Sequence, residues 1–397
     1  MGVEKAVNIE DLRRMARRRM PKLAWDFLEN GAEDEAGMAR NIEALRRHCL
    51  LPRYLVDVTR RNQETDLFGQ RFASPFGFGA TGTIGLFRRH SERYLAEAAL
   101  EADIPYVMSG AANASIEEIA KIAPDRTWYQ IYATLDREII HDQIARARDA
   151  GFTGLVVTVD VPVRSKREKN IRNGFSQRQR MRPLLFLEAL THPAWIAEYL
   201  RNGGPPTMAS WMKYAGQNGR LDDAVDLFVK NCPATNQTWQ DLRIYRDLWP
   251  RSLIVKGVLH PDDARMAADL GADGVIVSNH GGRQLDRAPA AIEMLPAVVE
   301  AAGERTCVMF DSGIRRGADI VVALCLGAKF AFLGRAGLYG VAAGGLAGAR
   351  RAYRIISEEI DLTLGQIGCT DIADLGPQWL WREGDALPAA LSKYAAE

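Results

Sequence analysis

Short apolar runs alternate with amphipathic stretches along most of the chain from about residue 75 onward. The runs occupy residues 76–80, 106–109, 128–132, 155–160, 253–256, 275–278, 307–311 and 330–334. Helical patterns follow several of them, at 115–122, 136–150, 261–270 and 317–326. Continuous apolar strands that alternate with helices predict a parallel sheet covered on both faces. Eight such units fit a closed (β/α)8 barrel, the TIM barrel of the α/β class.

An open, doubly wound sheet is the alternative arrangement for the same alternation of elements. Sheets of that kind that bind dinucleotides carry a GxGxxG turn after the first strand. No such turn follows the apolar run at 76–80. The closed barrel is therefore favoured, and residues 1–397 are expected to form one domain.

The chain begins with an extension, residues 1–72, that reads as helical. Asn8 is expected to cap a helix over 9–20, and a second segment begins at Pro21 and is closed by Gly31. Because these helices precede the first predicted strand, we expect them to plug or flank the barrel.

The barrel itself is predicted over residues 73–340. An insert at about 176–236 separates its fourth and fifth strands and is far longer than an ordinary connection. Residues 341–397 are expected to supply most of a C-terminal helix, which begins near residue 339, and a tail. Long excursions of this kind are usually lids, binding loops or disordered segments.

Composition and charge exclude several classes of protein. The formal net charge of +1 provides no field that would attract nucleic acid. The five cysteines include no CxxC pair, which argues against a disulfide framework or a zinc site and fits a reducing cytoplasm. The N-terminal segment lacks the apolar region of a secretory signal, and no apolar run reaches membrane-spanning length. We therefore expect a cytoplasmic location and no metal.

Polar and charged residues end most of the apolar runs. They are Ser109, Gln130, Tyr132, Thr158, Asp160, Lys256, Ser278, Asn279, His280, Asp311, Gly334 and Arg335. A single polar strand end is uninformative, because every strand must end somewhere. Barrel enzymes build their active sites at the carboxyl ends of the strands. The joint occurrence of His, Lys, Arg and Asp there predicts one active site.

The strongest local motif is SNHGGRQLD at 278–286. His280 directly follows a buried strand, and two glycines after it let the backbone pass close to a ligand. A lone histidine here would more often be structural. Beside Arg283 and Asp286, it reads as a general base with an anion-binding neighbour.

Two further motifs follow the seventh and eighth predicted strands. They are DSGIRRG at 311–317 and LGR at 333–335. Loops at these positions, together with a helix N-terminus, form the usual phosphate site of such barrels. Arg335 would supply a bidentate guanidinium for the phosphate, although a salt bridge that closes the barrel is the alternative.

A basic loop, DVPVRSKRE at 160–168, leaves the fourth strand. A solvated loop is one interpretation. The other is capture of a substrate carboxylate, because a guanidinium binds a carboxylate through two parallel hydrogen bonds. Residue types alone do not choose among Arg164, Lys166 and Arg167.

Together these segments resemble the FMN-dependent 2-hydroxy acid dehydrogenases and oxidases, a family that includes glycolate oxidase, L-lactate dehydrogenase and (S)-mandelate dehydrogenase. The resemblance extends from PKLAWDFLENGAEDE at 21–35 to LGQIGCTDIADL at 364–375. SNHGGRQLD and DSGIRRGADI are highly specific to this group. THPAWIAEYLRNGGP and IYRDLWPRSLIVKGVL are most similar to the mandelate dehydrogenases.

The resemblance implies FMN as cofactor and oxidation of a 2-hydroxy acid to the 2-keto acid. His280 would be the base, and Asp160 would hold it as an imidazolium. Tyr132 would bond to the reacting hydroxyl, and Arg167 and Arg283 would bind the substrate carboxylate. Either His280 takes the hydroxyl proton while hydride passes to flavin N5, or it takes the α-proton and leaves a carbanion.

The resemblance assigns most of the other candidate residues to the cofactor. Lys256 would lie near flavin N1 and O2 and stabilise negative charge there. The residues expected to contact the ring, the ribityl chain or the phosphate are Ala80, Thr81, Gly82, Ser109, Gln130, Thr158, Ser278, Arg283, Asp311, Gly313, Arg315, Gly334 and Arg335.

Three positions depart from the family pattern. Phe27 stands where a tyrosine usually bonds to the substrate carboxylate, and a lost hydrogen bond to a charged group is worth about 1.5–3 kcal/mol. Ala80 replaces a proline, which is a milder change. Ala111 replaces a bulky tryptophan of the short-chain enzymes, which favours a large or aromatic substrate.

The insert and the family bear on the expected partners. In mandelate dehydrogenase the matching insert binds the membrane, which suggests a quinone acceptor and a peripheral position on the inner face of the membrane. The segment PLLFLEAL at 183–190, with Trp195 and Trp211, suits an interface. A soluble lid or an oligomer contact is the alternative. A homotetramer is expected from the family.

Two rival functions remain open from the sequence. One is an oxygen-using oxidase, including one that decarboxylates its product. The other is a flavin-binding barrel that no longer catalyses, which only Phe27 favours and which the intact set of His280, Asp160, Arg167 and Arg283 opposes.

Overall fold

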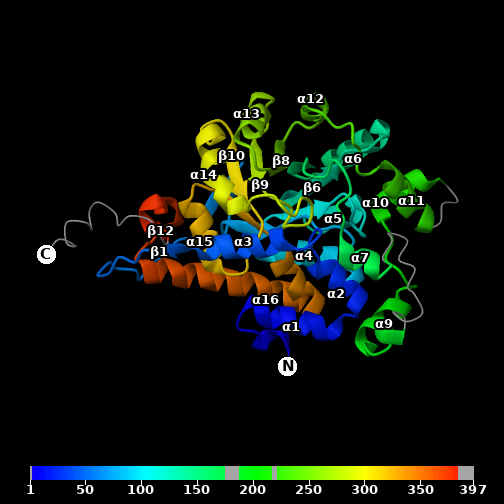
Figure 1. The fold of residues 1–397 in the computed structure, drawn as a ribbon, viewed down its shortest axis with the longest axis horizontal. Helices are drawn as coiled ribbons and strands as arrows, with labels where there is room; N and C mark the ends of the chain where they lie inside the picture. The colour runs from blue at the N-terminus through cyan, green and yellow to red at the C-terminus, as the bar shows by residue number, and fades with distance from the viewer. Residues whose placement is uncertain (1, 175–186, 217–220, 383–397) are drawn as a thin grey trace.

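The computed structural model describes residues 2–174, 187–216 and 221–382. Eight parallel strands close into a barrel in the order β10-β11-β4-β5-β6-β7-β8-β9 (Figure 1). The predicted (β/α)8 fold is therefore confirmed, and each predicted apolar run overlaps one barrel strand. The strands are β4 (Phe76–Phe78), β5 (Tyr106–Ser109), β6 (Thr127–Tyr132), β7 (Gly154–Thr158), β8 (Ser252–Val258), β9 (Gly274–Val277), β10 (Cys307–Phe310) and β11 (Phe330–Leu333).

The barrel strands are apolar on both faces because both faces are covered. One set of side chains fills the interior, where Val107, Trp128 and Val156 belong to a single packed cluster. Their neighbours along the strands, such as Tyr106 and Leu155, join the larger core beneath the outer helices. The outer helices are α4 (Ser91–Glu101), α5 (Ile116–Ala120), α6 (Arg137–Asp149), α12 (Trp239–Leu248), α13 (Pro261–Asp269), α14 (Ala291–Ala302), α15 (Gly317–Cys325) and α16 (Arg335–Ile367).

The N-terminal extension is only partly helical, which corrects the prediction for residues 1–72. Helices α1 (Ile9–Arg19), α2 (Lys22–Glu29) and α3 (Ala36–Arg46) form, and the side chain of Asn8 caps α1 as predicted. Helix α1 packs along α16, so these helices flank the barrel (Figure 1).

Short strands follow the three helices. Strand β1 (His48–Leu50) pairs with β12 (Leu380–Arg382), and β2 (Thr65–Leu67) pairs with β3 (Gln70–Phe72). A tight turn joins β2 to β3, and both of its central residues have positive φ, which suits a two-residue hairpin. Leu67 and Phe72 pack into the interior cluster of the barrel, so a hairpin plugs the barrel.

Helix α7 (Glu168–Arg172) precedes the insert. The insert itself contains α9 (Pro193–Arg201), α10 (Ala209–Met212) and α11 (Leu221–Asn231). Trp195 and Trp211 are buried and donate to backbone oxygens of the barrel loops, so these two side chains fit the alternative of a lid and not that of a lipid interface. Of PLLFLEAL, residues 183–186 lie outside the described residues, whereas Leu187 and Leu190 are exposed. No helix in the described parts of the chain is both long and apolar enough to cross a bilayer.

Candidate active site

A cavity of about 600 Å³ lies among the loops that follow the barrel strands. Most of the predicted site residues line it: Phe27, Ala80, Thr81, Gly82, Ala111, Tyr132, Arg167, Lys256, His280, Arg283, Asp311, Gly313, Arg315, Gly334 and Arg335. The other predicted residues are placed nearby but outside the lining. Ser109, Gln130, Thr158 and Ser278 are buried at strand ends, and Asp160 contacts His280.

His280 and Asp160 form a pair at this cavity. Nδ1 of His280 lies 3.0 Å from Oδ1 of Asp160, and no residue in the described part of the chain bonds to the Nε2 atom. Burial lowers the pKa of His280 below its ordinary value, although Asp160 opposes the shift. Burial disfavours ionisation of Asp160, but the interaction with His280, which includes a hydrogen bond, and the charge of Lys256 outweigh it and lower the pKa of this carboxyl group. The pair therefore combines a neutral imidazole with a carboxylate.

Backbone conformation and close contacts explain the two glycines that follow His280. His280, Gly281 and Gly282 all adopt positive φ. A Cβ atom at Gly282 would lie 2.4 Å from the backbone nitrogen of Met38, so only glycine allows α3 to approach this loop. A Cβ atom at Gly281 would lie 3.1 Å from Nη1 of Arg335, which donates to the oxygen of Gly281 at 3.0 Å.

The end of α2 orients two arginines of the site. Arg283 donates to the carbonyl oxygens of Phe27, Leu28 and Asn30, the last at 2.9 Å. Arg335 donates to Leu28 at 3.1 Å and Asn30 at 2.8 Å. The carboxyl end of a helix attracts cations, because its last carbonyl groups are unpaired and its dipole is negative there.

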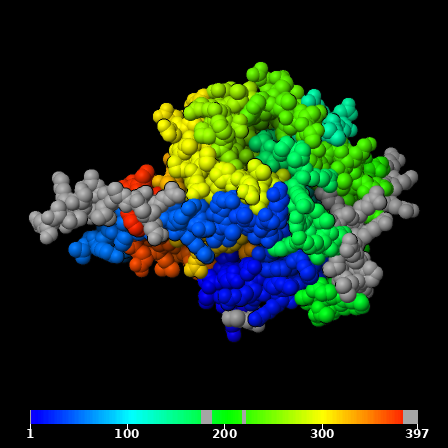
Figure 2. All heavy atoms as spheres, viewed as in Figure 1, coloured from blue at the N-terminus to red at the C-terminus, as the bar shows by residue number. Residues whose placement is uncertain are grey.

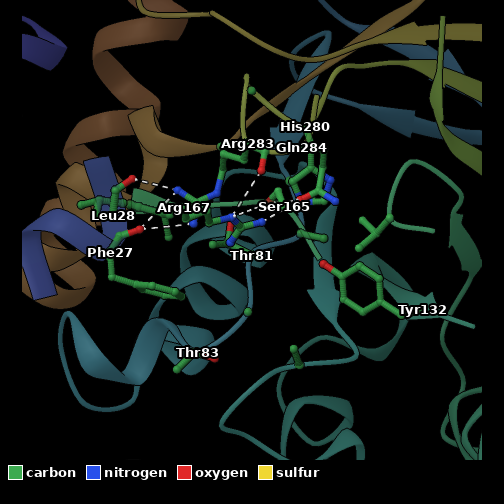
Figure 3. A pocket seen from close by; sticks show the side chains of 18 of the residues that line it. Phe27, Leu28, Thr81, Thr83, Tyr132, Ser165, Arg167, His280, Arg283 and Gln284 are labelled. Atoms are coloured by element: carbon green, nitrogen blue, oxygen red, sulfur yellow. Dashed lines mark hydrogen bonds between the residues drawn. The ribbon is translucent and has the colours of Figure 1, made fainter. Parts of the chain in front are cut away.

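Arg167 lies beside Arg283 (Figure 3). It donates to Gln284 at 2.8 Å and to Ser165 at 3.1 Å. Among the described residues, no carboxylate forms an ion pair with Arg167, Arg283 or Arg335. Burial lowers the pKa of all three, and the pKa of Arg283 is lowered further by the charges of Arg167 and Arg335. A cluster of one buried cation, Arg335, and two half-buried cations that are held only by neutral oxygens is a site for anions.

Lys256 lines the same cavity. Its Nζ atom lies 2.9 Å from Oδ2 of Asp311 and donates to Oγ of Ser278 at 2.9 Å. Burial would lower the pKa of Lys256, but Asp311 and Asp160 raise it above its ordinary value. The site therefore holds a fixed ammonium group.

One buried donor supports the expected fit of a flavin. Ser109 donates to Oε1 of Gln130 at 3.0 Å, whereas Nε2 of Gln130 is buried and has no partner in the described structure. A buried amide without an acceptor is costly, so a ligand oxygen is the expected partner. Together with Lys256 and the cations Arg315 and Arg335, these groups fit a ring with carbonyl oxygens that carries a phosphate.

The three basic residues of the loop at 160–168 occupy different positions. Lys166 is exposed and pairs with Glu168 at 3.1 Å. Arg164 lines the cavity rim, but it donates to the oxygens of Val229 and Cys232 near the end of α11. Arg167 is the one of the three that lies against Arg283.

Sequence reasoning missed one wall of the cavity. Met208, Val225 and Phe228 of the insert line it and pack in one apolar cluster with Ala111. The apolar face of the segment at 221–231 was the available signal, since it needed something to cover. The insert therefore acts in part as a cover of the site.

Phe27 lines the cavity at the position where the family usually has a tyrosine. Its ring lies 5.6 Å from the guanidinium carbon of Arg283 and 5.9 Å from the ring of Phe87. A cation over an aromatic face is attracted to it. The ring therefore supports Arg283, but it has no hydroxyl group that could donate to a substrate.

Comparisons with known proteins agree with this geometry. Residues 16–382 match the FMN-dependent dehydrogenase family. The chain is 41% identical to the (S)-mandelate dehydrogenase of Pseudomonas putida, over 95% of this chain and 94% of that protein. It is 37% identical to the L-lactate dehydrogenase of Caulobacter vibrioides, over 92% of this chain and 95% of that protein.

A solved structure shows the same fold. The crystal structure of the monotopic membrane protein (S)-mandelate dehydrogenase is similar, with a TM-score of 0.91 and 40% identity over 95% of this chain and 100% of that one. Because the family match spans nearly the whole chain, FMN is the cofactor. The chain belongs to the family of FMN-dependent 2-hydroxy acid dehydrogenases.

Proposed function

We propose that the chain oxidises an (S)-2-hydroxy acid with a bulky or aromatic side chain to the 2-keto acid. The observation that carries the proposal is the pair formed by a neutral His280 and the carboxylate of Asp160, beside Arg167 and Arg283, two half-buried guanidiniums without a carboxylate partner in the described chain. A base and an anion site within one cavity match the two functional groups of a 2-hydroxy acid.

Each protein group has a separate task. Arg167 and Arg283 bind the substrate carboxylate, and Tyr132 contacts the hydroxyl side of the substrate. Nε2 of His280 takes the hydroxyl proton, and Asp160 stabilises the imidazolium that results. Bound FMN supplies the acceptor for the hydrogen and the two electrons that leave the substrate carbon.

The residues that would hold the cofactor surround this pair. Lys256 and Gln130 would bind the ring, the first through its charge and the second through its unpaired amide. Arg315 and Arg335 would bind the phosphate. The loop at 79–82 would lie against the ring, since Ala80, Thr81 and Gly82 line the cavity.

The size of the apolar wall favours a large side chain on the substrate. Ala111 leaves space beside Met208, Val225 and Phe228, and all four line the cavity. Apolar walls bind apolar side chains in proportion to the area removed from water.

We further propose a quinone as electron acceptor and a peripheral contact of the insert with the membrane. The relative described as a monotopic membrane protein supports this, as do the exposed Leu187, Leu190 and Leu200. Hydrogen peroxide formed during aerobic turnover would instead identify an oxygen-using oxidase.

The direct test is anaerobic mixing of the purified yellow protein with (S)-mandelate, (R)-mandelate and L-lactate. We expect (S)-mandelate to bleach the flavin absorbance fastest and phenylglyoxylate to form in equal amount. Failure of every 2-hydroxy acid to bleach the flavin would contradict the proposed function.

A further inference from the structure

Helix α9 of the insert is bonded to a barrel loop on both sides of Phe87. Nε1 of Trp195 donates to the oxygen of Leu86 at 2.9 Å. The backbone nitrogen of Arg89 donates to Oε1 of Glu198 at 2.6 Å. Trp195 is only 4% exposed, so its hydrogen bond is shielded from water. Two side chains of α9 thus bond to the backbone before and after Phe87, at Leu86 and Arg89.

Glu198 also joins this loop to α1. Arg19 donates to the oxygen of Phe87 at 3.3 Å and pairs with Glu198. Burial and the nearby Arg88 lower the pKa of Arg19, and Glu198 is the acidic group that opposes this shift. The atoms of α9 lie close to the N-terminal helices at the surface (Figure 2). One carboxylate therefore connects α9, α1 and the loop.

Phe87 lies between α9 and the substrate site. Its side chain is buried, lines the cavity and packs on Phe27 at 5.9 Å between ring centroids. Phe27 in turn lies beneath the guanidinium of Arg283, whose nitrogens donate to the oxygen of Phe27. A shift of Phe87 would therefore change both the cavity surface formed by Phe87 and Phe27 and the position of Arg283.

We infer that Trp195 and Glu198 are positioning residues, which hold Phe87 and thereby fix the wall of the substrate site that carries Phe27 and Arg283. This inference rests on the proposed function, because it takes the cavity to bind a 2-hydroxy acid. Neither residue touches the His280–Asp160 pair. Their loss should therefore weaken substrate binding and leave the chemical step nearly unchanged.

The kinetic test compares Trp195→Phe and Glu198→Gln with a control on the same helix. Tyr199→Phe removes a hydroxyl that forms no hydrogen bond with the described residues, from a ring that stacks on Trp195 at 4.9 Å. We expect KM for (S)-mandelate to rise about two- to tenfold in the two test variants, because Trp195→Phe removes one hydrogen bond and Glu198→Gln replaces a charged acceptor with a neutral one that cannot form the ion pair with Arg19. We expect kcat to stay within about twofold in all three variants.

Hydrogen exchange of the segment at 84–90 provides a readout that needs no turnover. Exchange should be faster in both test variants and unchanged in Tyr199→Phe. Unchanged exchange, or an unchanged KM, in Glu198→Gln overturns the inference even if Trp195→Phe fails to fold. If the wild-type protein oxidises no 2-hydroxy acid, the proposed function fails, while hydrogen exchange still decides whether α9 holds the loop.

Discussion

Nδ1 of His280 and Oδ1 of Asp160 lie 3.0 Å apart, although the two residues come from opposite halves of the barrel sequence. The bond fixes the tautomer of the imidazole and leaves Nε2 as the atom able to accept a proton. Asp160 is also held by charge, because Lys256 and His280 both favour its ionised form.

Replacement of Asp160 by asparagine should lower kcat strongly. The amide keeps the size of the side chain but cannot stabilise an imidazolium, so we expect a loss of about 10²- to 10⁴-fold. Steady-state kinetics with (S)-mandelate measures the loss, and the flavin absorbance spectrum checks that the cofactor is still bound. A variant with wild-type kcat would contradict the role of Asp160.

The rate should fall in acid with an inflection below pH 6.5, the ordinary value for histidine, because burial lowers the pKa of His280. Only the neutral imidazole accepts a proton, so activity is present above the pKa of His280 and lost as pH falls through it. The pH dependence of kcat/KM measures this limb. An acid limb with its inflection clearly above that value would show that burial does not control this group.

Replacement of Arg167 by methionine should raise KM for the substrate about 10- to 100-fold, because a hydrogen bond to a charged group is worth about 1.5–3 kcal/mol. Lys166→Met is the matched control, since it also removes one positive charge but at an exposed position paired with Glu168. Similar KM values in the two variants would mean that charge in this loop, rather than the guanidinium at the cavity, attracts the substrate.

Replacement of Phe27 by tyrosine should lower KM. The ring already lies at the cavity beside Arg283, so a hydroxyl added to it is expected to reach the carboxylate site. A new hydrogen bond to a charged group would improve binding about 10- to 100-fold. Initial rates over a range of (S)-mandelate concentrations test this, and a KM that rises would show that the hydroxyl has no partner there.

Replacement of Ala111 by tryptophan should reverse the proposed preference for large substrates. The added ring would occupy the space beside Met208 and Phe228. We expect the ratio of kcat/KM for (S)-mandelate to that for L-lactate to fall at least about tenfold. A single methylene group already changes such a ratio by about tenfold or more, and a tryptophan ring excludes a larger part of the substrate. An unchanged ratio would place the substrate side chain elsewhere in the cavity.

The barrel and much of the candidate site follow from the sequence because their signals are local. A buried parallel strand is a continuous apolar run, and its polar end marks the rim that carries the candidate site, as at Asp311. The hairpin at Thr65–Phe72 was missed because three-residue strands are too short to show a clear period.

Contacts between distant segments were the least predictable. Tryptophan is common both at membrane interfaces and in protein cores, so the residue type of Trp195 and Trp211 does not distinguish the two locations. Their hydrogen bonds to the barrel loops, which exist only in the folded chain, place them in the core. The role of Phe228 in the cavity depends in the same way on how the insert folds back over the barrel.

The carbonyl groups at the end of α2 show that the candidate site depends on residues outside the barrel. Arg283 and Arg335 belong to barrel loops, yet their guanidiniums are aimed by Leu28 and Asn30, which precede the barrel in the chain. A shortened protein that began at the first barrel strand would keep every charged group assigned to catalysis and lose the oxygens that direct two of them. The N-terminal extension thus directs Arg283 and Arg335 through its backbone oxygens.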